Sequence, residues 1–173
     1  MGSIKKYTGS NIGGINKIIY AYAEDIDLIS YNENDLLAVI SLKSGKSWNF
    51  LYGTEDTITI SGEEEDTDAG IKYKYKIELL IPKDRPEVEI ELFGLNDHGI
   101  IIKAMDKNGT CRLFGSIDNP MFKLGKLLWP GQVEGYNGYK LTLYAEFDQP
   151  AYYITGENQS DFIEEILPGG EPA

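Results

Sequence analysis

The stretch from Ile71 to Leu79, with the sequence IKYKYKIEL, limits the possible folds more than any other part of the chain. Apolar and aromatic residues alternate there with charged residues at every position. Successive side chains of a β-strand point to opposite faces, so this alternation predicts a strand with one buried face and one face in solvent. The buried face is predicted to hold Ile71, Tyr73, Tyr75, Ile77 and Leu79, and the exposed face Lys72, Lys74, Lys76 and Glu78.

Strand signals dominate the rest of the chain as well. Runs rich in β-branched and aromatic residues cover 15–22, 26–29, 36–42, 48–52, 57–61, 100–105, 110–114, 121–128 and 138–147. Many short strands at regular spacing are typical of a β-sandwich or a β-barrel. We therefore predict a mainly β fold, α+β at most, in which residues 1–150 form one structural domain.

One short central helix is predicted after residue 84. Asp84, Pro86 and Glu87 stand in the order of a capping residue, a first-turn proline and a capping-box acid. The apolar residues at 88, 92 and 95 would then share one helical face. Residues 88, 90 and 92 also alternate, so a strand is the alternative for this segment.

The pair Asn108-Gly109 lies between two apolar runs and predicts the turn of a hairpin. Both residue types accept a positive φ, which hairpin turns require. The stretch from Asp106 begins like a calcium loop, but Cys111 stands where that loop needs glycine and Ile117 where it needs glutamate. We therefore interpret Asn108 and Gly109 as structural turn residues and expect no metal site there.

The acidic segment 62–70, GEEEDTDAG, lies between two predicted strands and is expected to form a long hairpin loop. Its carboxylates are dense enough to attract a hard cation. Consecutive acids at a hairpin tip point in different directions, however, and are usually solvated. We name Glu63, Glu64, Glu65 and Asp66 as candidate contacts between copies of the chain.

The segment 151–173 is predicted to be an acidic C-terminal arm that follows a completed domain. An apolar cluster with helical spacing lies within it, at Phe162, Ile163, Ile166 and Leu167. A helix this short is not stable alone in water, so it needs a partner surface. We expect it to dock on a neighbouring subunit; packing back over an open end of its own sandwich is the alternative.

Catalytic and cofactor motifs are scarce. His98 is the single histidine and lies in a turn-like stretch, and Cys111 is the single cysteine. The chain has no nucleophile elbow, Walker loop, dinucleotide fingerprint or zinc-ligand spacing. We predict that the protein is not an enzyme and needs no cofactor. The lone cysteine allows no internal disulfide, consistent with assembly in a reducing cytoplasm.

The charge and hydropathy of the chain limit the classes of partner that it can bind. A net charge of −12 argues against a dedicated nucleic-acid grip on the outer surface. The sequence has no apolar run of 18 residues and no apolar region near its N-terminus, so we expect neither a membrane span nor a signal peptide.

Three stretches together resemble a known family. They are the strand Y-x-x-x-I-x-x-x-I-P-K at 73–83, the hairpin D-x-N-G-x-x-x-L-x-G at 106–115 and the closing strand NGYKLTLYAEFDQP at 137–150. Their order resembles small structural proteins of tailed bacteriophages of Bacteroides and related gut bacteria, including crAss-like phages. The resemblance spans nearly the whole chain, although its motifs are strand and turn signals rather than catalytic ones.

The resemblance implies a virion protein of the tail tube or the head–tail connector, made in the host cytoplasm. Its partners would be its own copies in a cyclic ring, the neighbouring tail or connector rings and, non-specifically, the double-stranded DNA in the lumen. An acidic lumen would repel phosphates, which agrees with the net charge. The alternative function is a carbohydrate- or surface-binding β-sandwich module, with Trp48, Trp129, Tyr152 and Tyr153 as candidate contacts.

Overall fold

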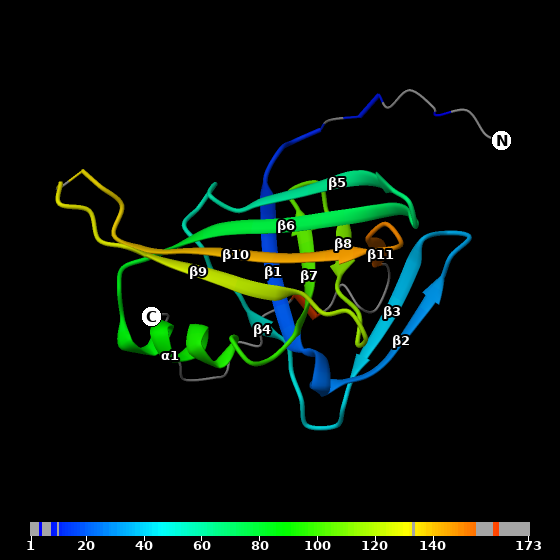
Figure 1. The fold of residues 1–173 in the computed structure, drawn as a ribbon, viewed down its shortest axis with the longest axis horizontal. Coiled ribbons are helices and arrows are strands. Elements are labelled where there is room, and N and C mark those ends of the chain that lie inside the picture. Colours follow the sequence, from blue (N-terminus) through cyan, green and yellow to red (C-terminus); the bar gives the residue numbers. More distant parts are fainter. Residues whose placement is uncertain (1–3, 5–7, 10, 133, 155–160, 163–173) are drawn as a thin grey trace.

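The computed structural model describes residues 4, 8–9, 11–132, 134–154 and 161–162, which form two packed β-sheets and one α-helix (Figure 1). One sheet has seven strands in the order β2-β3-β11-β8-β7-β1-β4, and the other has four in the order β5-β6-β10-β9. The strands are β1 (Ile15–Tyr22), β2 (Ile26–Asn32), β3 (Leu37–Leu42), β4 (Asn49–Phe50), β5 (Thr59–Thr67), β6 (Gly70–Pro82), β7 (Ile100–Asp106), β8 (Cys111–Phe114), β9 (Phe122–Leu128), β10 (Gly138–Phe147) and β11 (Tyr152–Ile154). The mainly β sandwich with one short helix is therefore confirmed.

The main core lies between the two sheets. β6 and β10 contribute Ile77, Leu79, Leu141 and Leu143, all at most 1% exposed, and β1 and β7 face them from the other sheet. The predicted alternation is confirmed in the second half of β6, where Ile77, Leu79 and Ile81 are buried while the lysines of the strand face solvent. Burial was wrong for Ile71, which is 53% exposed because the first part of β6 extends beyond the core, and Tyr73 and Tyr75 are only partly buried. The sequence pattern thus fixed the orientation of the strand at the centre of the smaller sheet.

The predicted helix is present as α1 (Pro86–Gly94). Leu92 is buried and Val88 packs against the main core, so the apolar stripe faces the sandwich as expected. The expected cap is wrong, because Arg85 occupies the N-cap position and makes no side-chain capping bond. The carboxylate of Asp84 instead accepts a 2.5 Å hydrogen bond from the hydroxyl of Tyr139 on β10. Because the Asp84 carboxylate bonds to Tyr139, it does not cap the helix.

The hairpin turn at Asn108-Gly109 is present where the sequence predicts it, but the type of turn differs from the prediction. Gly109 has φ of 83°, and its N–H donates to Asp106 O, while Asp106 N–H donates to Thr110 O. Asn108 does not have a positive φ, so this is a three-residue loop with glycine in the left-handed position rather than a two-residue turn. The Asn108 side chain instead holds the N-terminal segment, accepting from Ile12 N–H and donating to Ile12 O.

The prediction of a long acidic hairpin loop at 62–70 is wrong. Residues 62–67 belong to β5 and pair in register with β6, from Glu63 opposite Lys74 to Thr67 opposite Gly70. Only two residues, 68 and 69, separate the two strands. The acids stay extended because β5 pairs along one side with β6, where Lys74 lies opposite Glu63 and Lys72 opposite Glu65. The four acidic contact candidates are therefore strand residues with fixed directions.

The domain boundary at residue 150 is also wrong. β11 inserts into the seven-stranded sheet, where Tyr153 pairs with Leu37 of β3 on one side and with Arg112 of β8 on the other. Strand pairing on both sides makes residues 152–154 an integral part of the sheet. The sandwich is not complete until this last strand is in place.

A second, smaller core covers the outer face of the seven-stranded sheet, and Phe162 belongs to it. Phe162 is 2% exposed and packs in a cluster with Ile19, Ile101 and Ile154. Lys17 Nζ donates to the Phe162 carbonyl at 2.9 Å. For Phe162, docking on a neighbouring subunit is therefore wrong, and packing on its own sheet is correct. Ile163, Ile166 and Leu167 lie outside the described residues.

Candidate self-association surface

The edge strand β9 is apolar and basic. β10 pairs with it along one side, and no described strand lies on the other. The side chains of Phe122, Leu124 and Leu127 are 45%, 61% and 47% exposed. The charged residues of the strand are Lys123 and Lys126. An edge strand of this kind presents unpaired backbone N–H and C=O groups together with apolar side chains, which makes it a template for pairing with another chain.

The opposite edge of the same sheet, β5, is acidic. β6 pairs with it on one side, and no described strand pairs with it on the other. Its outer half is the exposed run Glu63, Glu64, Glu65 and Asp66, and the strand contains no lysine or arginine. The two edges of this sheet therefore carry opposite charge, with four acids on β5 and two lysines on β9.

The outward face between these edges carries a ladder of ion pairs. Lys74 Nζ lies 2.7 Å from a Glu65 oxygen and 3.6 Å from one of Glu146, and Lys140 Nζ lies 2.8 Å from Glu78. Lys74 lowers the pKa of the Glu65 carboxyl, chiefly through their hydrogen bond, and Lys140 does the same for Glu78. The alternating lysines of β6 are therefore neutralised across the sheet and do not form a free basic strip.

The helix α1 lies on the β9 side of the smaller sheet (Figure 1). Burial lowers the pKa of Lys123, and Glu89 of α1 opposes that shift, which places the helix next to the strand. Ile90 and Phe93 of α1 are 70% and 69% exposed, and Trp129 just after β9 is 69% exposed. Large apolar side chains this exposed, gathered along one edge, are typical of a protein contact rather than of a solvated surface.

The aromatic candidates for carbohydrate binding do not come together. Trp48 lies with its ring 4.2 Å from Lys103 Nζ, and Tyr153 packs its ring 4.2 Å from the Arg112 guanidinium. Trp129 is exposed beyond β9, on the smaller sheet. Tyr152 lines a cavity together with Tyr31, a residue that the sequence pattern does not indicate.

The candidate catalytic residues lie apart. His98 stacks edge-on against Tyr22 with ring centroids 5.2 Å apart, and its Nδ1 is 3.7 Å from Glu24. Cys111 is buried on the other face of the larger sheet, where desolvation raises the pKa of its thiol. Among the described residues, no group of three or more His, Cys, Asp or Glu side chains could hold a metal ion. None of the helices in the described part of the chain is long and apolar enough to cross a membrane.

The sequence interpretation found the acidic half of this surface and missed the basic half. The sequence predicts a strand at the run FKLGKLL, but it does not predict that this strand lies at a sheet edge. The available signal was its charge, because it carries two lysines and no acid in a chain with a net charge of −12. No protein family, curated protein or solved structure that we compared matches this chain.

Proposed function

We propose that the protein is a non-enzymatic virion structural protein that assembles head to tail with its own copies into a ring or tube. Its place would be the tail or the head–tail connector of a bacteriophage, with DNA passing through the lumen. The observation that carries the self-assembly is the complementarity of the two free edges of the four-stranded sheet, β5 and β9. The assignment to a phage virion is supported by the sequence resemblance.

Charge favours the contact of unlike edges. Two β5 strands side by side would bring together two runs of four acids, and two β9 strands would bring together their lysines. Like charges directly opposite one another on paired strands are destabilising, whereas opposite charges stabilise a pair by about 0.2–1 kcal/mol. The self-complementary dimer is therefore disfavoured at both edges, and β5 of one copy is directed to β9 of the next.

Strand direction agrees with this pairing. Three successive antiparallel pairings separate β5 from β9, so the two edge strands of one sheet run in opposite directions. If a second copy is placed beside the first in the same orientation, its β5 runs antiparallel to the first copy's β9. A repeated contact of this head-to-tail type builds a closed ring or an open helical assembly.

The size of the contact is sufficient only if it includes more than one strand. A stable interface buries about 1,200–2,000 Å² in total, which is more than a single strand pair provides. The exposed Ile90 and Phe93 of α1 and the exposed Trp129 lie on the β9 side of the molecule and would add apolar area there. We therefore include α1 in the proposed contact.

The charge ladder suits a wall along which DNA moves. The outward face of the four-stranded sheet carries five lysines, at 72, 74, 76, 126 and 140, and four glutamates, at 63, 65, 78 and 146. Tight binding of DNA requires lysines that release counterions from phosphate. Four of these lysines, at 72, 74, 76 and 140, already pair with glutamates and gain little from phosphate, so such a face would let a duplex pass without holding it.

The test of head-to-tail assembly is a charge exchange between the two edges. Wild-type protein should show masses that are multiples of 19.4 kDa by light scattering, and rings or tubes by electron microscopy. Glu63→Lys and Lys126→Glu should each weaken assembly, and equimolar mixing of the two single variants should restore a contact between them. A wild-type protein that stays at 19.4 kDa at high concentration would overturn the proposal.

A matched pair of leucines controls for general surface effects. Leu124→Glu places an acid on the basic edge β9, where it should abolish assembly, whereas Leu28→Glu makes the same change on β2 of the other sheet. The two leucines are 61% and 59% exposed, so neither change should unfold the protomer. Equal loss of assembly in both variants would show that the β9 edge has no special role.

A further inference from the structure

We propose that the cavity between β2, the β8–β9 loop and the β10–β11 loop binds a single neutral pyranose sugar. The cavity has a volume of about 240 Å³, and its lining includes Tyr31, Gly115, Ser116, Asn119, Asp148 and Tyr152. Pockets for drug-sized ligands span about 300–1,000 Å³, so this one suits a smaller molecule. None of its lining residues belongs to the edge strands β5 and β9, so the proposal does not depend on assembly.

An aromatic wall forms one side of the cavity. Tyr31 of β2 and Tyr152 of β11 have ring centroids 4.7 Å apart and planes tilted by 47°. The strand between them, β3, has the small Ala38 opposite Tyr31, which leaves space for the two rings to meet over it. Tyr31 is 41% exposed, so aromatic surface remains open to the cavity. The apolar C–H face of a sugar ring packs on such a surface.

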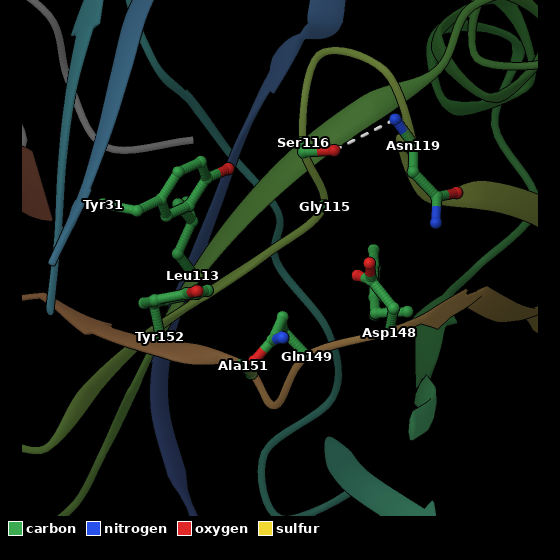
Figure 2. A pocket seen from close by; sticks show the side chains of 10 residues that line it. Tyr31, Leu113, Gly115, Ser116, Asn119, Asp148, Gln149, Ala151 and Tyr152 are labelled. Carbon is green, nitrogen blue, oxygen red and sulfur yellow. Dashed lines mark hydrogen bonds between the residues drawn. The ribbon is translucent and has the colours of Figure 1, made fainter. Parts of the chain in front are cut away.

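A polar wall forms the other side. Figure 2 shows Ser116, Asn119 and Asp148 across the cavity from the two tyrosine rings. Asn119 is held in place, because its backbone N–H donates to Ser116 Oγ at 3.0 Å and its side-chain amide donates to Glu146 O at 2.5 Å. One of the two amide N–H groups is therefore committed, and the Asn119 carbonyl oxygen is available as an acceptor. Within the described part of the chain, no hydrogen bond or ion pair engages the Asp148 carboxylate.

Gly115 lies at the cavity wall in a backbone conformation that favours glycine. It has φ of 99°, and a Cβ atom there would lie 3.1 Å from the carbonyl oxygen of Ile100. A side chain at this position would be strained and would also crowd the backbone of β7. Glycine therefore allows the chain to pass from Leu113 to Ser116 along the cavity wall.

The lining selects among ligand classes. An anion would meet the Asp148 carboxylate, and no lysine or arginine lines the cavity to balance it. A purely apolar ligand would leave the Asn119 and Asp148 acceptors without partners, which is costly. An ammonium group is bound best when aromatic faces surround it, whereas both rings here lie on one side. A pyranose has one apolar face and a rim of hydroxyl donors, which matches both walls.

The test uses the full-length protein and a panel of methyl glycosides of glucose, galactose, mannose and N-acetylglucosamine. Binding is followed by chemical shifts of the labelled protein. At least one glycoside should shift the resonances of residues 31, 116, 119 and 152 with a millimolar Kd. Asp148→Ala should weaken that binding at least tenfold, the loss expected when a charged acceptor is removed. Asp148 is exposed, so the variant should fold normally.

The control is Tyr144→Ala, which removes a tyrosine of similar exposure, 43%, from the outward face of the smaller sheet. It should leave the Kd unchanged, whereas Tyr31→Ala should raise it. The sugar assignment is overturned if no glycoside shifts these residues at 50 mM, or if Asp148→Ala and Tyr144→Ala behave alike. It is also overturned if tetramethylammonium chloride binds in the cavity and the glycosides do not. None of these outcomes affects the mass measurements that test assembly.

Discussion

Replacing Asp161 with asparagine should destabilise the folded chain strongly, because Asp161 is the carboxylate that balances a buried lysine. Lys103 lies on β7, has no exposed surface and forms an ion pair with Asp161. Asp161 comes from the segment after β11, next to the buried Phe162. Asp161→Asn keeps the shape of the side chain and removes its charge, so the ammonium of Lys103 would stay buried without a carboxylate.

The expected loss is about 3 kcal/mol of unfolding free energy at pH 7. Breaking one partner of a buried ion pair costs about 3–5 kcal/mol. The free energy of deprotonating Lys103 sets an upper limit to this loss, because the buried lysine can become neutral instead of staying charged. Deprotonating a lysine of ordinary pKa 10.5 at pH 7 costs about 4.8 kcal/mol, at about 1.36 kcal/mol per pKa unit. We place the loss near the lower end because the ring of Trp48, 4.2 Å from Lys103 Nζ, still stabilises the cation.

The loss should shrink as the pH rises. Burial lowers the pKa of Lys103 even in the wild type, so between the folded pKa and 10.5 the unfolded state binds more protons, and stability rises with pH. Removing Asp161 lowers the folded pKa further and moves the start of that window towards neutral pH. The deficit of Asp161→Asn relative to wild type should therefore fall between pH 7 and pH 10, by up to about 1.36 kcal/mol per pH unit.

Urea denaturation followed by tryptophan fluorescence at pH 7, 8, 9 and 10 measures this deficit. Asp97→Asn, on an exposed turn, is the matched control and should change stability by less than about 0.5 kcal/mol. Adding Lys103→Met to Asp161→Asn should recover most of the loss, because it removes the unpaired charge. A variant as stable as wild type, or a deficit independent of pH, would show that Asp161 does not balance Lys103 and that the segment packs elsewhere.

Three further changes test other parts of the fold. Gly109→Val should cost about 1 kcal/mol or more in unfolding free energy, because φ is 83°, whereas Gly13→Val, in equally open space without a positive φ, should cost less; thermal melts compare the two. Phe162→Ala should cost about 3–5 kcal/mol in urea denaturation if the side chain fills the second core; a loss below about 1 kcal/mol would contradict that packing. The lysine partners of Glu65 and Glu78 lower the pKa values of these carboxyls in the folded state. The stability that the two carboxylates contribute is therefore present above their unfolded pKa and is lost as the pH falls through their folded pKa. The double variant Glu65→Gln with Glu78→Gln should show a smaller loss of stability at acidic pH.

The sequence predicted those parts of the fold in which the type of each residue depends on its own burial or backbone conformation. β6 alternates because one of its faces is buried and the other is wet, and the Gly109 turn is readable because the left-handed conformation favours glycine. The inner part of β5 was predicted as a strand, but its acidic outer half was not, because that half extends beyond the core and no buried face imposes alternation on the acids. Its strand conformation comes from pairing with β6, which is a property of two distant segments.

Lys103 shows a different limit. It follows Ile100, Ile101 and Ile102, and this continuous apolar run indicates a strand buried on both faces. A lysine that continues such a strand must be buried as well and must have a partner. The existence of a partner was therefore predictable, but its identity was not, because Asp161 lies 58 residues away and is brought back only by the path of the chain after β11.

The two ends of the smaller sheet show why an assembly surface is harder to read than a core. A core strand reveals itself through burial, which leaves a periodic pattern in one segment. An edge reveals itself only relative to the other edge, because the acids of β5 and the lysines of β9 are each ordinary for a solvated strand. The opposite charges of the two strands indicate a contact only once the strand order β5-β6-β10-β9 is known, because this order places them at the two edges of one sheet. The even number of antiparallel strands then gives the next copy the right direction, so charge and topology together support the head-to-tail contact.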